Sequence, residues 1–143
     1  MDRDVSTVNA PMIETQHLIL QPVAAEDADA LHGISNEPAV RRYLWDDEPV
    51  EKATIRGLIS QSTRTFSEAG IGLFGVRRRG NKDLIGFCGF VRLEGMEAPE
   101  LAYELTQGAW GEGLATEVSR ACQRRHTTWC AGRSSCPGTE RSK

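Results

Sequence analysis

The sequence lacks the long apolar runs that mark membrane proteins and secreted precursors. No run approaches the roughly 20 residues of a membrane-spanning helix. The amino terminus, with Asp2 and Asp4 and no apolar core, is not a secretory signal. Its 143 residues can form one hydrophobic core but are few for two. We therefore expect a single cytoplasmic domain that does not bind a membrane.

Cysteine is also scarce, and none of the four forms a C-x-x-C pair. Cys88 lies in an apolar, strand-like run, so we expect reduced thiols rather than a disulfide framework. His126, Cys130 and Cys136 are the nearest approach to a metal-ligand set, but no second pair accompanies them. The sequence therefore predicts no metal.

The end of the chain has no aliphatic residues: no Leu, Ile, Val, Met or Phe follows Val118. Residues 1–119 carry 11 Lys and Arg against 19 Asp and Glu, whereas residues 120–143 carry 6 against 1. The overall net charge of −3 argues against a nucleic-acid binder. The last segment therefore differs in kind from the rest of the chain.

So few apolar side chains cannot offset the roughly 1–2 kcal/mol of backbone entropy that each residue loses on ordering. We therefore expect three regions. Residues 1–12 form a flexible arm, residues 13–125 form the folded domain, and residues 126–143 form a disordered tail.

Hydrophobic periodicity predicts a strand and two helices in the first half. The apolar run at residues 18–20 indicates a strand. Apolar residues then recur at helical spacing over residues 24–34, and Asn36, Glu37 and Pro38 end that helix. A second helix runs from near Pro49 to residue 69, where Gly70 ends it.

The second half predicts three strands and a final helix. Residues 72–78 and 84–93 indicate a hairpin, because the turn between them contains Gly and Asn. After a loop at residues 94–99, residues 100–105 alternate as a third strand. A helix over residues 113–125 follows directly. The order β-α-α-β-β-β-α predicts an α+β domain built on an antiparallel meander.

The junction at residues 105–116 carries the candidate chemistry. Gly111 and Gly113 let the backbone approach a ligand closely, and the helix start offers unpaired amides and a positive dipole end. This pattern predicts a phosphate seat, although an isolated glycine-rich turn is as often only a turn. Two nucleotide motifs are excluded: Thr116 stands where a dinucleotide fingerprint has its third glycine, and no Gly-Lys-Ser/Thr of a P-loop is present.

Three stretches, in family order, resemble the GNAT acetyltransferases. Residues 100–105 followed by 110–117 are similar to the family's cofactor motif, in the form carried by the Rim-type ribosomal-protein acetyltransferases. Residues 13–22 resemble that branch's opening strand, and residues 36–44 the segment after its first helix. The resemblance implies a three-layer GNAT fold. It also implies transfer of an acetyl group from acetyl-CoA to a primary amine, either a protein amino terminus or a small amine.

The resemblance also implies roles for single residues. The amides of the glycine-rich turn would bind the pyrophosphate, and Leu105 and Thr106 would line the pantetheine arm. The candidate cofactor residues are Leu105, Thr106, Trp110, Gly111, Glu112, Gly113, Leu114, Ala115 and Thr116.

The attacking amine must lose a proton, so a carboxylate is the expected helper. Glu104 is the first candidate and Glu100 the second, since both project from one face of the last strand. The same alternation fits a solvated strand face equally well. Trp45, beside the acidic residues 46–48, either rims an acceptor pocket that favours a cationic amine or belongs to an exposed acidic loop.

Members of the family continue beyond this helix with a β-α-β-β portion that is not recognisable in residues 126–143. We therefore expect a truncated chain whose tail resembles out-of-frame translation, and we assign no acid to protonate the CoA thiolate. Two alternatives stay open. One is an inactive fragment that binds CoA weakly, and the other is a homodimer in which a partner covers the exposed strand edge.

Overall fold

The computed structural model describes residues 12–91 and 98–131, and the side chains of these residues up to Arg125. The predicted amino-terminal arm up to residue 11, most of the predicted loop at 94–99, and residues 132–143 of the predicted tail lie outside the described residues. Within the described residues, no helix is long and apolar enough to cross a membrane.

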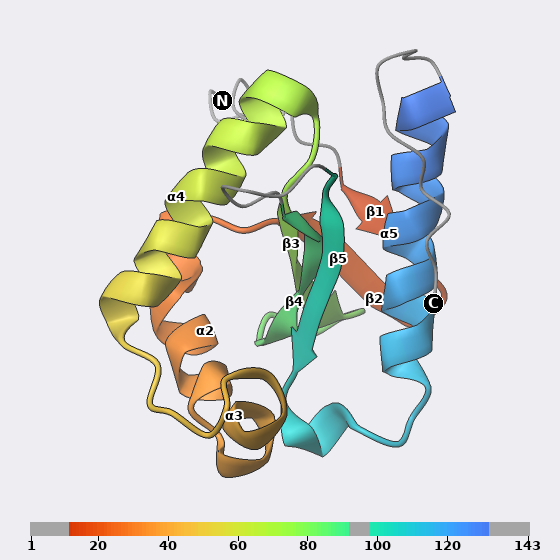
Figure 1. Ribbon diagram of the computed structural model, residues 1–143. Coiled ribbons are helices and arrows are strands. Elements are labelled where there is room, and N and C mark those ends of the chain that lie inside the picture. The colour runs from red at the N-terminus through yellow and green to blue at the C-terminus, as the bar shows by residue number, and fades with distance from the viewer. Residues whose placement is uncertain (1–11, 92–97, 132–143) are drawn as a thin grey trace.

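A five-stranded antiparallel sheet forms the middle layer, with its strands in the order β1-β2-β3-β4-β5 (Figure 1). The predicted meander is confirmed, with Phe87 opposite Glu104 where its last two strands pair. Strand β5 has a neighbour on one side only among the described residues, so it forms an edge. The strands are β1 (Ile13–Glu14), β2 (Leu18–Pro22), β3 (Leu73–Arg78), β4 (Leu84–Val91) and β5 (Glu100–Leu105).

Helices cover both faces of this sheet, which gives the α+β, three-layer arrangement. Figure 1 shows α2, α3 and α4 on one side and α5 on the other. The α-helices are α2 (Ala28–Ser35), α3 (Pro38–Leu44), α4 (Lys52–Ala69) and α5 (Leu114–Ala131). Two 3-10 turns, η1 (Ala25–Asp27) and η2 (Gln107–Ala109), precede α2 and follow β5.

Helix α3 and the short strand β1 are absent from the sequence-based prediction. Pro38 was interpreted only as the end of the preceding helix, but it also occupies the first turn of α3. The same property of proline explains both the end of α2 and the start of α3. Proline lacks an amide hydrogen and fixes φ near −65°, so it disfavours continuation of a helix and suits the start of a new one. Strand β1 is only two residues long, which is too short to show a period.

The last helix differs from the prediction at both ends. The turn η2 separates it from β5, whereas a direct entry was predicted. Helix α5 also runs to Ala131, beyond the predicted end at residue 125, so the prediction of disorder from residue 126 is wrong for residues 126–131. The prediction weighed side-chain burial alone, but a helix once formed gains one backbone hydrogen bond for each residue added.

Each face of the sheet carries its own hydrophobic cluster. Leu105, Cys88 and Val118 belong to the cluster beneath α5. Phe87 and Ile59 belong to the cluster beneath α2 and α4. Because side chains alternate along a strand, neighbouring residues of β4 and β5 serve opposite clusters.

The cysteines in the described core are consistent with the prediction of reduced thiols. Cys88 and Cys122 are free and buried. A hydrogen bond with Cys122, and burial, raise the pKa of the Cys88 thiol well above its ordinary value. The neutral Cys88 thiol therefore acts as a small apolar group in the cluster beneath α5.

At Gly89, the backbone of β4 lies too close to the chain at the start of β3 to leave room for a side chain, which can be tested by substitution. A Cβ at this position would lie 2.1 Å from the carbonyl oxygen of Gly72 and 2.8 Å from the Cα of Leu73. Backbone atoms cannot move aside cheaply, so we expect Gly89→Ala to lower the free energy of unfolding by about 1–3 kcal/mol or more. Urea unfolding followed by circular dichroism measures this change.

Gly57→Ala is the matched control. Gly57 lies within α4, and nothing stands within 4 Å of a Cβ built there. Alanine is favoured over glycine in a helix, so this variant should gain about 0.5–1 kcal/mol. Equal unfolding midpoints for the two variants would contradict the close approach of β4 to β3.

Candidate active site

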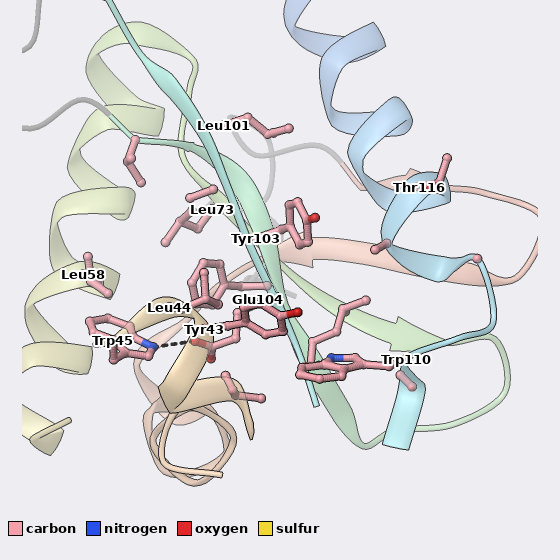
Figure 2. Close-up of a pocket in the computed structure, with 18 of the residues that line it drawn as sticks. Tyr43, Leu44, Trp45, Leu58, Leu73, Leu101, Tyr103, Glu104, Trp110 and Thr116 are labelled. Carbon is pink, nitrogen blue, oxygen red and sulfur yellow. Dashed lines mark hydrogen bonds between the residues drawn. The ribbon is translucent and has the colours of Figure 1, made fainter. Parts of the chain in front are cut away.

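Glu104 is a carboxylate held inside the protein near the end of β5. It is only 1% exposed. Its Oε2 accepts a hydrogen bond from the Ser35 hydroxyl at 2.7 Å, and its Oε1 accepts one from the Trp45 indole Nε1 at 3.0 Å. Figure 2 shows the bond between Trp45 and Glu104. The alternative of a solvated strand face is therefore wrong at this position.

The environment of Glu104 alters its affinity for a proton. Burial raises the pKa of Glu104, because a carboxylate loses hydration inside the protein. The hydrogen bonds from Ser35 and Trp45 act in the opposite direction, and the negative charge of Glu37 raises the pKa further. The net effect is a raised pKa, so ionised Glu104 is a stronger base than an exposed glutamate.

The chain around Trp45 positions the indole for this contact. The Trp45 amide bonds to the carbonyl of Arg41, as does the amide of Asp47. Asp46 and Asp47 have φ angles of 54° and 60°, in the left-handed region, which aspartate tolerates better than most residues. The two aspartates thus shape a tight turn after Trp45, in addition to any charge that they supply.

Glu100, the second candidate base, lies at the opposite end of β5. It is exposed, and it is not among the residues that line the cavity described below. The structure therefore does not bring the two carboxylates together, although both are on the same strand.

The glycine-rich turn keeps the features of an anion seat. Gly111 and Gly113 have φ angles of 82° and 79°, which favour glycine, and both are exposed. Within the described part of the chain, the backbone amides of residues 111–116 donate no hydrogen bond to the protein. Those of Leu114, Ala115 and Thr116 belong to the first turn of α5, where a helix leaves its amides unpaired.

Side chains from distant elements hold this turn in place. The Glu37 carboxylate accepts hydrogen bonds from the Thr106 hydroxyl at 2.5 Å and the Gln107 amide at 2.9 Å. The Trp110 indole donates to the carbonyl of Leu105 at 2.9 Å. These bonds fix the path from β5 into the turn.

Glu112 of the turn and Glu117 of α5 are both hydrogen-bonded to side chains of other elements. The Arg78 guanidinium contacts both carboxylate oxygens of Glu112, at 2.9 and 3.3 Å, and lowers the pKa of Glu112. Glu117 accepts hydrogen bonds from Thr15 and His17, which tie the start of α5 to the loop before β2. The charge of Glu112 is therefore balanced beside the proposed phosphate seat.

One cavity of about 920 Å³ connects the turn with Glu104 around the edge of β5 (Figure 2). Of the lining residues, Glu104 is the only Asp, Glu, Lys, Arg or His. The lining residues are Val40, Tyr43, Leu44, Trp45, Leu58, Leu73, Phe87, Val91, Leu101, Ala102, Tyr103, Glu104, Leu105, Ala109, Trp110, Gly111, Gly113, Ala115 and Thr116.

Most predicted cofactor residues line this cavity, and the others support it. Leu105, Trp110, Gly111, Gly113, Ala115 and Thr116 are in the lining. Thr106 and Glu112 instead bond to Glu37 and Arg78, and Leu114 is buried in the cluster beneath α5. Trp45 lines the cavity as well, whereas the acidic residues 46–48 are exposed and do not line it.

Ser35, Glu37 and Arg78 contribute to the site although the sequence did not indicate a role for them there. Their partners lie 69, 69 and 34 residues away along the chain, so no local pattern marks them. Within the described residues, no three His, Cys, Asp or Glu side chains are grouped as a metal site requires.

Comparisons with known proteins agree with this geometry. The acetyltransferase (GNAT) domain family matches residues 17–129. The chain is 32% identical over 111 residues to an uncharacterized N-acetyltransferase, YoaA, of Bacillus subtilis. The match covers 76% of this chain and 62% of that protein, so the chain spans about six-tenths of the relative's length.

Two solved structures share the fold. The acetyltransferase from Agrobacterium tumefaciens superposes with a TM-score of 0.69 at 22% identity, over 84% of this chain and 66% of that one. RimL, a ribosomal L7/L12 alpha-N-protein acetyltransferase solved in complex with coenzyme A, superposes with a TM-score of 0.64 at 16% identity, over 86% and 70%. With the fold and the family match in agreement, the chain belongs to the GNAT acetyltransferase domain family.

Proposed function

We propose that the protein is an acetyl-CoA-dependent N-acetyltransferase that moves an acetyl group from acetyl-CoA to a primary amine. The supporting observation is the single cavity that joins the glycine-rich turn to buried Glu104. In this proposal the amides of residues 111–116 bind the pyrophosphate. The pantetheine arm follows β5 past Leu105, which brings the thioester towards Glu104.

The proposed reaction is a direct transfer. The ammonium group of the acceptor gives a proton to the Glu104 carboxylate, and the neutral nitrogen attacks the thioester carbon. The new C–N bond forms as the C–S bond breaks, and the acylated nitrogen loses its second proton to water to give a neutral amide. The sulfur leaves with its electron pair as a thiolate that takes a proton from water. Glu104 then releases its proton to solvent.

In this proposal, the edge of β5 that has no partner strand among the described residues supplies hydrogen-bond donors for the developing oxyanion. The Thr106 amide bonds to Ile85 of β4 at 2.8 Å. Because peptide groups alternate in direction along an antiparallel strand, the amides of Tyr103 and Leu105 face the open edge. An amide fixed in place stabilises negative charge there without reorganisation.

We propose a protein amino terminus or a small amine as the acceptor. The Rim-type resemblance of the sequence favours the former, as does the fold shared with RimL, a ribosomal L7/L12 alpha-N-protein acetyltransferase. Such acceptors are found in the cytoplasm, where we place the protein.

A second candidate is a module that binds CoA weakly without turnover. The observation that favours it is the edge position of β5, which leaves the cavity without a further strand on that side among the described residues. Pairing of two copies along this edge would close the cavity. Detectable acetyl-CoA binding with no product from any amine would support the module, and a monomer by size-exclusion chromatography would exclude the pairing.

The phosphate seat can be tested by calorimetry with two ligands. Acetyl-CoA should bind, whereas S-acetylpantetheine, which lacks the pyrophosphate, should bind far more weakly. Gly113→Ala forces a side chain into the left-handed region, at a cost of about 1–2 kcal/mol, and should weaken acetyl-CoA binding roughly tenfold.

Gly108→Ala is the control for that experiment. Gly108 lies in the same connection, in η2, and nothing stands within 4 Å of a Cβ built there. This variant should bind acetyl-CoA as the unaltered protein does. If acetyl-CoA and S-acetylpantetheine bind equally well, the turn is not a phosphate seat.

The proposed base is tested by Glu104→Gln. The amide cannot accept the proton, so kcat should fall by about 10²–10⁴-fold while acetyl-CoA binding is retained. In the unaltered protein, kcat should fall as pH drops through the raised pKa of Glu104, because the protonated carboxyl is no longer a base. Glu100→Gln, on the same strand but exposed, should leave both quantities unchanged.

The same variant has a predicted effect on stability. The folded-state pKa of Glu104 is raised. Its contribution to stability is therefore present in full below the unfolded-state pKa and is lost as pH rises through the folded-state pKa. The glutamine side chain of the variant does not titrate, so urea unfolding should show Glu104→Gln gaining stability relative to the unaltered protein as pH rises above about 4.3. Parallel pH profiles would show that Glu104 is not the buried, perturbed base proposed here.

A further inference from the structure

The end of the cavity on the α4 side is lined almost wholly by hydrocarbon. We call this region the acceptor end. Leu73 and Phe87 are buried, and the remaining side chains pack against the cluster beneath α2 and α4. Its apolar residues are Trp45, Leu58, Leu73, Phe87, Val91 and Ala102.

Among the described residues, Glu104 is the only charged side chain that lines the cavity at the acceptor end. Glu104 projects from β5, and each of its oxygens accepts one hydrogen bond from the protein. An ionised carboxylate has about four lone-pair sites, so capacity remains for an ammonium group. Glu37 is not in the lining and is committed to Thr106 and Gln107.

The acidic loop beyond Trp45 is not part of the cavity. Asp46, Asp47 and Glu48 are exposed and are not among the lining residues. Asp47 already pairs with Arg41 at 3.3 Å. Among the described residues, a second cation on an acceptor would therefore find no carboxylate within the acceptor end.

We infer that the preferred acceptor is a primary amine with one positive charge and an apolar body. This inference rests on the proposed function and names the substrate class of the same site. The ammonium group meets Glu104, and the hydrocarbon body lies between α4 and the sheet, against Leu58 and Phe87. A second ammonium buried there would be unpaired, and unpaired charges in apolar surroundings are strongly disfavoured.

The inference is tested by calorimetry on the full chain, a measurement that does not require turnover. Linear amines from ethylamine to hexylamine should bind about fourfold more tightly for each methylene buried, until the acceptor end is full. The α,ω-diamines of equal length should bind at least tenfold more weakly than the monoamines. Each ligand is titrated with and without bound CoA, at a pH where Glu104 is ionised.

Variants of Leu58 sharpen the test. Leu58→Ala should flatten the dependence on chain length. Leu58→Asp places a carboxylate in the acceptor end and should shift the preference towards diamines. Gly57→Ala, one position away in α4 and without a neighbour within 4 Å of a Cβ built there, should leave the ligand series unchanged. Thermal unfolding of each variant verifies that it is folded.

The outcomes separate this inference from the proposed function. Monoamine binding that rises with chain length, with no acetylated product, supports the inferred amine specificity of the acceptor end and contradicts the proposed acetyl transfer. Acetylation of diamines in preference to monoamines of equal length supports the function and overturns the inference. Affinity that is independent of chain length also overturns the inference.

Discussion

The structure depends on the burial of one carboxylate. Glu104 is almost completely removed from water, and an unpaired charge in that position would be strongly destabilising. Two donors from different elements compensate for the lost water: Ser35 at the end of α2 and Trp45 just after α3. Both helix ends must therefore be fixed relative to β5. The same two hydrogen bonds therefore fix the positions of α2 and α3 relative to β5 and influence the pKa of Glu104.

The position of β5 in the sheet allows the cavity beside this carboxylate to extend to the opposite face of the sheet. Its alternation directs Ala102 towards the cluster beneath α2 and α4, and Glu104 towards Ser35 at the end of α2, whereas Leu105 points towards α5. A strand inside the sheet would separate these two faces, but β5 is an edge among the described residues, so one cavity passes around it. A ligand that follows the edge thus reaches both the start of α5 and the interior beneath α4.

Local patterns predicted the elements that carry this site, but not the contacts that adjust it. The alternation of residues 100–105 and the glycines at 111 and 113 each have a short-range signature, and both were identified. Helix α3 was missed because Pro38 fits two local interpretations, and α5 extends past a segment with few apolar side chains. The contacts of Glu104 with Ser35 and Trp45, and of Thr106 with Glu37, were missed because they join residues some 60–70 positions apart, which periodicity cannot detect.

The two ends of the cavity differ in the sign of the charge that they attract. At one end, unpaired amides and the positive end of the α5 dipole attract an anion, and Arg78 offsets the only acidic side chain of the turn. At the other end, the single charge is the Glu104 carboxylate, which attracts a cation. A pyrophosphate placed beside Glu104 would be repelled by the negative carboxylate. An ammonium group placed at the amides would be repelled by the positive end of the α5 dipole. The charges of the described residues therefore favour one orientation, with the anionic donor at the start of α5 and the cationic acceptor at Glu104. This preference does not require contacts that recognise the rest of either molecule.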